Sequence, residues 1–145
     1  MDSPARILVV DDDPDFLAST RIMLQDESYR VAVAPGEDEA LSEMAVEKPD
    51  LLILDLIMSK LDSGFQFMWT VKRDERFKDI PILMVTSVDR LLRTDFARRS
   101  DSPGLTTEEA YLPVEQYLVK PVKATELVSS VESILARVEK RAVTE

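Results

Sequence analysis

Short apolar runs alternate with amphipathic segments along this chain. Continuous aliphatic runs are typical of strands that are buried on both faces, and strands that alternate with helices predict a parallel sheet with right-handed crossovers. The predicted strands are Arg6–Val10, Arg30–Ala34, Leu51–Leu54, Ile80–Val85 and Tyr117–Val119. We therefore expect one α/β domain over residues 1–145, with its core at about 5–140.

Helix signals lie between these runs. Asp13 is a natural N-cap and Pro14 a natural first helical residue. The apolar stripe of that helix is formed by Phe16, Leu17, Met23 and Leu24, with Thr20 in the same row. Further helices are indicated by Ala40, Leu41, Met44 and Ala45, by Phe65, Met68 and Val71, and by Leu127, Val131, Ile134 and Val138 within Ala124–Arg141.

An enlarged segment, at about 88–115, separates the last two predicted strands. Ser102-Pro103-Gly104 divides it, and Thr106 and Glu109 have capping-box spacing. We expect a helix, a turn, and a second short helix or ordered loop; a tolerated surface insertion is the alternative. Its arginines, Arg90, Arg93, Arg98 and Arg99, suit either a solvated helix face or contact with an acidic partner.

Polar residues follow four of the predicted strands. They are Asp11 and Asp12, Asp55, Thr86, and Lys120. The carboxyl ends of parallel strands meet at one edge of a sheet, where open α/β sheets bind ligands. Taken singly, each residue has an ordinary explanation as a helix cap or a solvated turn residue. Their coincidence at one edge favours a shared site.

The chemistry of this set suits a divalent cation and a phosphoryl group. Clustered carboxylates repel one another unless a cation or proton neutralises them, and Mg²⁺ prefers oxygen ligands. Thr86 and Lys120 would hold phosphoryl oxygens, which makes Asp55 the candidate nucleophile.

Composition narrows the function further. The net charge of −10 argues against a nucleic-acid or anionic membrane surface. With no cysteine and no histidine, the chain has no thiolate or imidazole for catalysis or metal binding. No apolar run approaches the roughly 20 residues that span a bilayer, and the amino terminus lacks a signal-peptide pattern. We expect a cytoplasmic protein without a membrane partner.

Four stretches resemble the receiver domain of bacterial two-component response regulators, of the single-domain, chemotaxis-regulator-like kind. They are Ile7–Pro14, Asp50–Asp55, Pro81–Ser87 and Tyr117–Pro121. The resemblance covers nearly the whole chain. It implies a flavodoxin-like, doubly wound sheet of five parallel strands in the order 2-1-3-4-5.

The resemblance also implies roles for individual residues. Asp55 would accept a phosphoryl group from a phosphohistidine on a sensor kinase or phosphotransfer protein. Mg²⁺ would be held by Asp12, Asp55 and the main-chain carbonyl of Ile57, with Asp11 acting mainly through metal-bound water. Thr86 and Lys120 would bind the phosphoryl group, Tyr117 would turn inward on activation, and the Lys120–Pro121 peptide bond would be cis.

The chain departs from the family pattern near the acceptor. Ser59 replaces the usual proline, and the loop that ends at Gly64 is about one residue longer than usual. The two variable positions nearest the phosphoryl group, Ile57 and Val88, are both apolar. We hypothesise that they cannot orient an attacking water, so that the acyl phosphate is long-lived.

The leading hypothesis is a stand-alone signalling switch that acts through protein contacts, either on a target or within a phosphorelay, rather than an enzyme. A domain cut from a longer protein is the alternative, although Met1 and the fraying end fit a complete product. A Mg²⁺-dependent phosphatase commonly has a second Asp as general acid where this chain has Ile57. An inert interaction module would not need the five polar residues, and a flavin phosphate would be repelled by the acidic first loop. The kinase, the target and any homodimer stay open.

Overall fold

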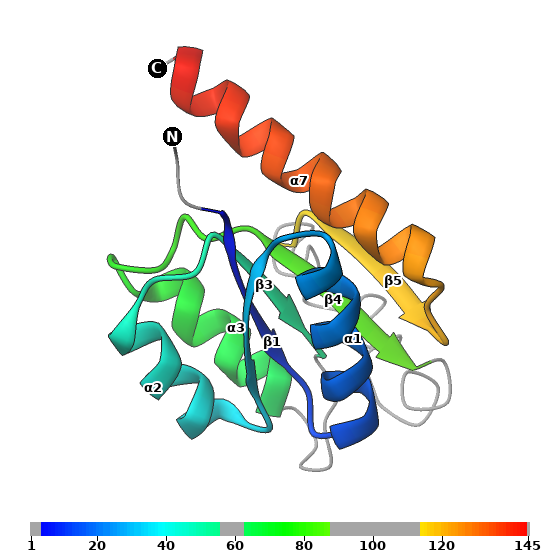
Figure 1. Ribbon diagram of the computed structural model, residues 1–145. Coiled ribbons are helices and arrows are strands. Elements are labelled where there is room, and N and C mark those ends of the chain that lie inside the picture. Colours follow the sequence, from blue (N-terminus) through cyan, green and yellow to red (C-terminus); the bar gives the residue numbers. More distant parts are fainter. Residues whose placement is uncertain (1–3, 56–62, 88–113, 145) are drawn as a thin grey trace, which may run out of the picture.

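The computed structural model describes residues 4–55, 63–87 and 114–144. Helices and strands alternate along the chain, as the hydrophobic pattern predicts (Figure 1). The strands are β1 (Arg6–Val10), β2 (Arg30–Ala34), β3 (Leu51–Leu54), β4 (Ile82–Ser87) and β5 (Gln116–Lys120). The helices are α1 (Pro14–Asp26), α2 (Glu37–Val46), α3 (Ser63–Arg73) and α7 (Ala124–Thr144).

All five strands form one parallel sheet in the order β2-β1-β3-β4-β5. This is the flavodoxin-like order that the resemblance implies, so the predicted fold class is confirmed. The central strands β1 and β3 are fully buried along their length. Their aliphatic residues need cover on both faces, which only crossover helices on both sides of the sheet supply.

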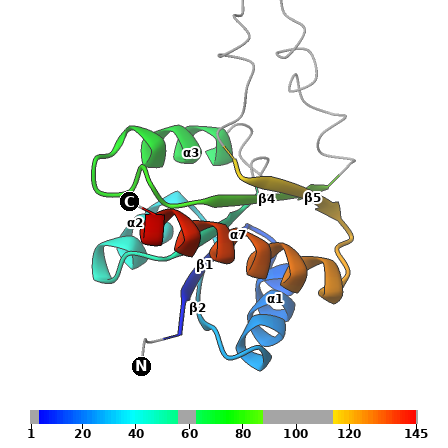
Figure 2. The same cartoon turned by 90° about the horizontal axis from the view of Figure 1, so that it is seen from above.

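Two apolar layers lie on opposite faces of the sheet (Figures 1 and 2). Because successive strand residues point to opposite faces, Ile7 and Val9 of β1 pack towards α1 and α7, while Leu8 and Val10 pack towards α2 and α3. The other strands follow the same alternation. Hence β1, β3 and β4 are held from both sides, and the carboxyl edge of the sheet has a defined position.

The fourth and fifth strands differ from the sequence prediction at their ends. Ile80 lies in a turn before β4, where its N–H donates to the Phe77 carbonyl at 3.0 Å, and Pro81 has no N–H for the ladder. At the other end, β4 continues to Ser87 because Thr86 and Ser87 pair with Val119 and Lys120 of β5. Thr86 is therefore the last residue but one of β4, and Lys120 is the last residue of β5. Both lie within their strands and not beyond them.

The first helix begins as predicted. The carboxylate of Asp13 accepts a hydrogen bond from the Asp15 N–H at 3.0 Å, and Pro14 is the first residue of α1. The N–H of Leu17 donates to the Asp13 carbonyl at 3.1 Å. This capped turn fixes the chain direction immediately after the acidic pair Asp11 and Asp12.

Among the described residues, no helix has the length and apolar character needed to cross a bilayer.

Candidate functional site

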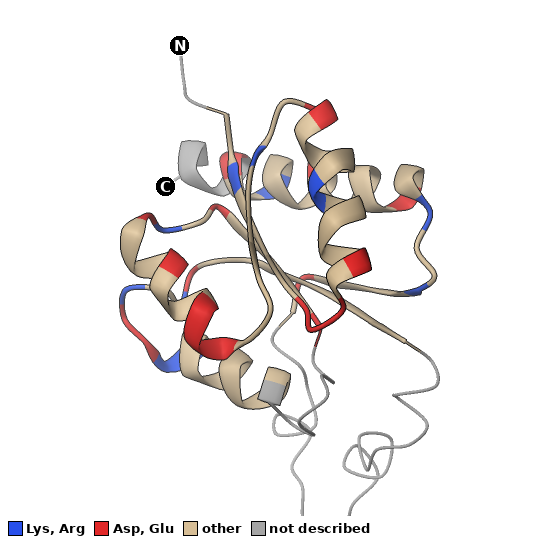
Figure 3. Cartoon of the chain, turned by 60° about the horizontal axis from the view of Figure 1, so that its bottom comes forward, with Lys and Arg blue, Asp and Glu red and all other residues tan. Residues whose placement is uncertain are grey.

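Three carboxylates meet at the carboxyl edge of the two central strands. Asp11 and Asp12 follow β1 and Asp55 follows β3, and one carboxylate oxygen from each lies within 4.8 Å of the others. Backbone pairing brings them together, because the Asp55 N–H donates to the Val10 carbonyl at 3.1 Å. Figure 3 shows the turn between β1 and α1 as a continuous acidic segment.

Lys120 reaches this cluster from β5, the outermost strand of the sheet. Its Nζ donates to Asp11 Oδ2 at 2.6 Å and lies 3.6 Å from Asp55 Oδ2. The peptide bond between Lys120 and Pro121 is cis. Residues that are far apart in the sequence thus form one cluster of three negative charges and one positive charge, because their strands end at the same edge.

The cluster is shielded from water. The side chains of Asp11 and Asp55 are 1% and 0% exposed, and that of Lys120 is 16% exposed. Burial raises the pKa of the Asp11 carboxyl above its usual value, because the charged form loses hydration. The hydrogen bond from Lys120 and the one from the Asp13 N–H oppose this rise in pKa, and the neighbouring charge of Asp12 adds to it.

Thr86 supplies a buried hydroxyl on the strand between Asp55 and Lys120. The residue is 1% exposed, and its Oγ1 makes no hydrogen bond within the described part of the chain. Buried hydroxyls are nearly always paired, since an unpaired one costs free energy. An unpaired hydroxyl at this edge is what a site for an oxygen-rich ligand would contain.

The remaining predicted site residues lie elsewhere. Tyr117 is 64% exposed on β5 and does not join the cluster. Ile57, Ser59 and Val88 lie outside the described residues, as do the arginines of the enlarged segment. The predictions about the loop after Asp55 and about residues 88–113 therefore stay predictions.

One contact of the site is missing from the sequence prediction. The Phe16 ring lies over Lys120, with its centroid 4.3 Å from Nζ. From the sequence, Phe16 is simply part of the apolar stripe of α1. The available signal was its position in the first helical turn after Asp13-Pro14, which places it beside the carboxyl edge of the sheet.

The donor set fits a hard divalent cation. The cluster offers only oxygen atoms from Asp11, Asp12 and Asp55, and it offers them from two adjacent strands. Mg²⁺ is typically bound by a few carboxylates together with water and phosphate oxygens. A bound cation would also offset the unfavourable burial that raises the pKa of Asp11.

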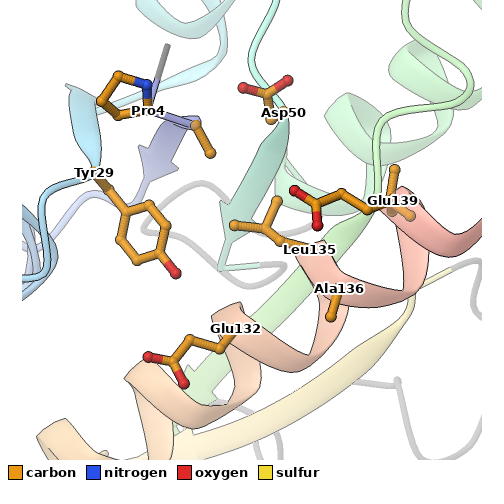
Figure 4. Close-up of a pocket in the computed structure, with 9 residues that line it drawn as sticks. Pro4, Tyr29, Asp50, Glu132, Leu135, Ala136 and Glu139 are labelled. Atoms are coloured by element: carbon orange, nitrogen blue, oxygen red, sulfur yellow. The ribbon is translucent and has the colours of Figure 1, made fainter. Parts of the chain in front are cut away.

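A separate pocket lies at the opposite, amino-terminal edge of the sheet (Figure 4). Its volume is about 490 Å³, and it lies between the starts of β1 and β3 and the second half of α7. Tyr29 points into it, and Asp50, Glu132 and Glu139 line it. Because the strands run the full depth of the sheet between them, this pocket is distinct from the carboxylate cluster.

Comparison with known proteins identifies the family of this chain. The model of the response regulator receiver domain matches residues 7–132. This chain belongs to that family. Receiver domains act as signalling switches in two-component systems.

Individual relatives of this receiver domain differ in length. A 14.6 kDa protein of Leptolyngbya boryana, called uncharacterized, is 36% identical over 87% of this chain and 86% of its own length. The regulator RpaA of Synechocystis sp., named as a DNA-binding dual master transcriptional regulator, is 32% identical over 93% of this chain but only 51% of its own length. The receiver domain described here thus spans about half of that relative.

A solved structure has the same fold. The crystal structure of a putative response regulator from Chloroflexus aurantiacus superposes with a TM-score of 0.71 at 31% identity. The match covers 92% of this receiver domain and 98% of the other chain.

Proposed function

We propose that this protein is a phosphoacceptor switch in which Asp55 takes a phosphoryl group from a phosphohistidine on a sensor kinase or phosphotransfer protein. The observation that carries the proposal is the cluster itself. Asp11, Asp12 and Asp55 place carboxylate oxygens within 4.8 Å of one another, and the Lys120 ammonium lies between Asp11 and Asp55. Such a cluster costs folding free energy unless it serves a ligand.

Each residue of the cluster has a proposed role. Asp55 is the nucleophile, Asp11 and Asp12 hold Mg²⁺ together with Asp55 and the main-chain carbonyl of Ile57, and Lys120 pairs with the phosphoryl oxygens. Bound Mg²⁺ would neutralise charge that develops on the phosphoryl oxygens during transfer. The unpaired hydroxyl of Thr86 would donate to one of these oxygens.

The transfer itself is a single displacement. A carboxylate oxygen of Asp55 forms a bond to phosphorus while the bond between phosphorus and the donor breaks, and the leaving group departs with the electron pair. A departing imidazolate takes a proton from water and becomes neutral imidazole. Because the Asp55 side chain is 0% exposed, we expect the surrounding chain to move before a donor can align with it.

The output of the switch would be protein contacts. Phosphorylation adds negative charge at one edge of the sheet and can bias a surface between two arrangements. We propose that the chain works as one receiver domain in the cytoplasm, where sensor kinases draw on ATP, and that Tyr117 on the exposed side of β5 reports the change. Which protein it contacts is set by the surface around that strand.

The test uses a small phosphate donor and intact-protein mass spectrometry. With Mg²⁺ and acetyl phosphate, we expect one added phosphoryl group, which is absent in Asp55→Asn and absent after chelation of Mg²⁺. The matched control is Asp26→Asn, an exposed aspartate at the end of α1 that should be phosphorylated at position 55 like the unaltered protein. An unaltered protein that gains no phosphoryl group would overturn the proposal.

A further inference from the structure

The Phe16 ring is a part of the site to which the proposed function assigns no role. Phe16 lies in the first turn of α1 and is half-buried against the apolar layer that contains Ile7 and Val9. One face of its ring is turned to Lys120 Nζ, 4.3 Å from the ring centroid. A cation at this distance from a ring face is attracted by the negative quadrupole of the ring.

The ammonium of Lys120 is enclosed by two kinds of partner. On one side it donates to Asp11 Oδ2 at 2.6 Å and lies 3.6 Å from Asp55 Oδ2. On another side it meets the Phe16 ring, and its side chain is only 16% exposed. The ring therefore occupies a position around the ammonium that water would otherwise take.

The two carboxylate distances show why a further constraint matters. The contact with Asp11 is a short hydrogen bond, whereas the distance to Asp55 exceeds hydrogen-bond length. Lysine has a long flexible stem and a strongly hydrated head, so an unconstrained ammonium would turn outward to water. The Phe16 ring lies over the ammonium and would disfavour its movement away from Asp55.

The ring is itself held by a rigid element. The Asp13 cap at 3.0 Å, Pro14 and the hydrogen bond from the Leu17 N–H fix the turn of α1 that carries Phe16. Groups held by capped helices keep their position better than groups on loops. The acidic pair and the ring are thus set by one short stretch of chain, residues 11–17.

We infer that Phe16 is a positioning residue, whose aromatic face holds the Lys120 ammonium between Asp11 and Asp55 for phosphoryl transfer. This inference rests on the proposed function. Removing the ring face should slow phosphorylation of Asp55 without preventing it, because Asp55 and the metal-binding carboxylates stay in place. An aromatic replacement should act like phenylalanine, and an aliphatic one should not.

The first measurement does not involve phosphate. In the unphosphorylated protein, the methylene protons next to Lys120 Nζ should be shifted upfield in the NMR spectrum by the ring current of Phe16. The shift should disappear in Phe16→Leu and persist in Phe16→Tyr. Trp69→Leu is the control, because it removes another ring that faces a cation, Arg73, on the other side of the sheet.

The second measurement is the rate of phosphorylation by acetyl phosphate with Mg²⁺. We expect Phe16→Leu to be slower by about 5-fold, and Phe16→Tyr and Trp69→Leu to stay near the unaltered rate. Replacing Phe16 by phenylalanines with increasing numbers of ring fluorines should lower the rate stepwise, because fluorine weakens the ring quadrupole while the ring stays in place. A purely packing role would not follow fluorine number.

The outcomes separate the two claims. Two results would overturn the role of Phe16 and leave the proposed function standing. One is phosphorylation of Phe16→Leu at the unaltered rate. The other is a phosphorylation rate that is equally low in Phe16→Leu and Phe16→Tyr. An unaltered protein that shows the ring-current shift but never gains phosphate on Asp55 would instead overturn the proposed function, and the role of Phe16 with it.

Discussion

At the scale of single residues, we expect Thr86 to disfavour the unphosphorylated protein. Its hydroxyl is buried at 1% exposure and makes no hydrogen bond among the described residues. A buried hydroxyl without a partner costs about 1–3 kcal/mol. In the proposed phosphorylated state the hydroxyl gains an acceptor, so the same residue would favour that state.

Replacing Thr86 by valine should therefore stabilise the unphosphorylated protein and remove the hydrogen bond that favours the phosphorylated state. We expect Thr86→Val to stabilise the unphosphorylated protein by about 1 kcal/mol, because the shape is kept while the unpaired hydroxyl is removed. Thr86→Ser keeps the hydroxyl and loses a methyl group, so it should destabilise by about 1 kcal/mol. Urea unfolding without Mg²⁺ measures both. A destabilised Thr86→Val would show that the hydroxyl has a partner after all.

A second residue links stability to alkaline pH. Tyr29 points into the pocket at the amino-terminal edge of the sheet. Burial raises the pKa of its phenol above the ordinary 10.0, and the charges of Glu132, Glu27 and Glu139 raise the pKa further. The phenol is therefore more reluctant to ionise in the folded chain than in the unfolded chain.

The sign of the pH effect follows from this difference. A raised folded-state pKa contributes stability that is complete below the unfolded pKa and is lost as pH rises through the folded pKa. We expect the unaltered protein to lose stability relative to Tyr29→Phe above about pH 10 and to match its trend near about pH 8. Urea midpoints across this range test the prediction. Tyr117→Phe, at an exposed tyrosine, is the control for loss of a phenol outside this pocket.

At the scale of elements, α2 begins less favourably than α1. Asp13 caps α1 with its side chain, whereas Gly36 at the N-cap of α2 makes no side-chain hydrogen bond. Glu39 stands three residues after Gly36, which is the capping-box position for a glutamate. The start of α2 therefore contains half of a capping box and lacks the hydroxyl that completes it.

Gly36→Ser should stabilise the protein by a few tenths of a kcal/mol, because the serine hydroxyl accepts from the N–H of Glu39. Among the described residues, a Cβ at position 36 would meet the Glu39 side chain, with Oε2 at 3.1 Å and Cδ at 4.0 Å, which is the far end of a flexible side chain. The φ of −165° is ordinary extended backbone. Gly36→Ala supplies the Cβ without the hydroxyl and should be less stable than Gly36→Ser by thermal unfolding. Equal stabilities would rule out the capping explanation.

At the scale of the whole molecule, we expect the carboxylate cluster to couple folding to Mg²⁺. A ligand that binds only the folded state stabilises it by about 2.7 kcal/mol at a concentration 100 times its dissociation constant. We expect Mg²⁺ to raise the unfolding temperature, at constant ionic strength, and a chelator to reverse the rise. Asp12→Asn should weaken this response and, by removing one of the crowded charges, should stabilise the metal-free protein. An unchanged response in Asp12→Asn would place the cation elsewhere.

Much of this fold follows from patterns that the sequence carries locally. The alternation of aliphatic runs with helical stripes is sufficient for the parallel sheet, and the polar residues after Val10 and Leu54 are sufficient to bring Asp11, Asp12 and Asp55 to one edge. The start of β4 was predicted too early, because Ile80 lies in a turn and Pro81 has no N–H for the ladder. Its carboxyl end was predicted wrongly because pairing with β5 prolongs the strand to Ser87, and pairing partners are not visible in a local pattern. The contact between Phe16 and Lys120 was missed for the same reason, since it joins two distant parts of the chain.

The alternation along β1 and β3 restricts which genetic changes the protein can tolerate. Apart from Arg6, every side chain of these strands is aliphatic and enclosed, so exchanges among leucine, isoleucine and valine should cost little. Loss or gain of a single codon within either strand is different, because it turns the whole run over and draws the aspartate at its end away from its neighbours. In these two strands the number of residues is therefore constrained more tightly than their identity.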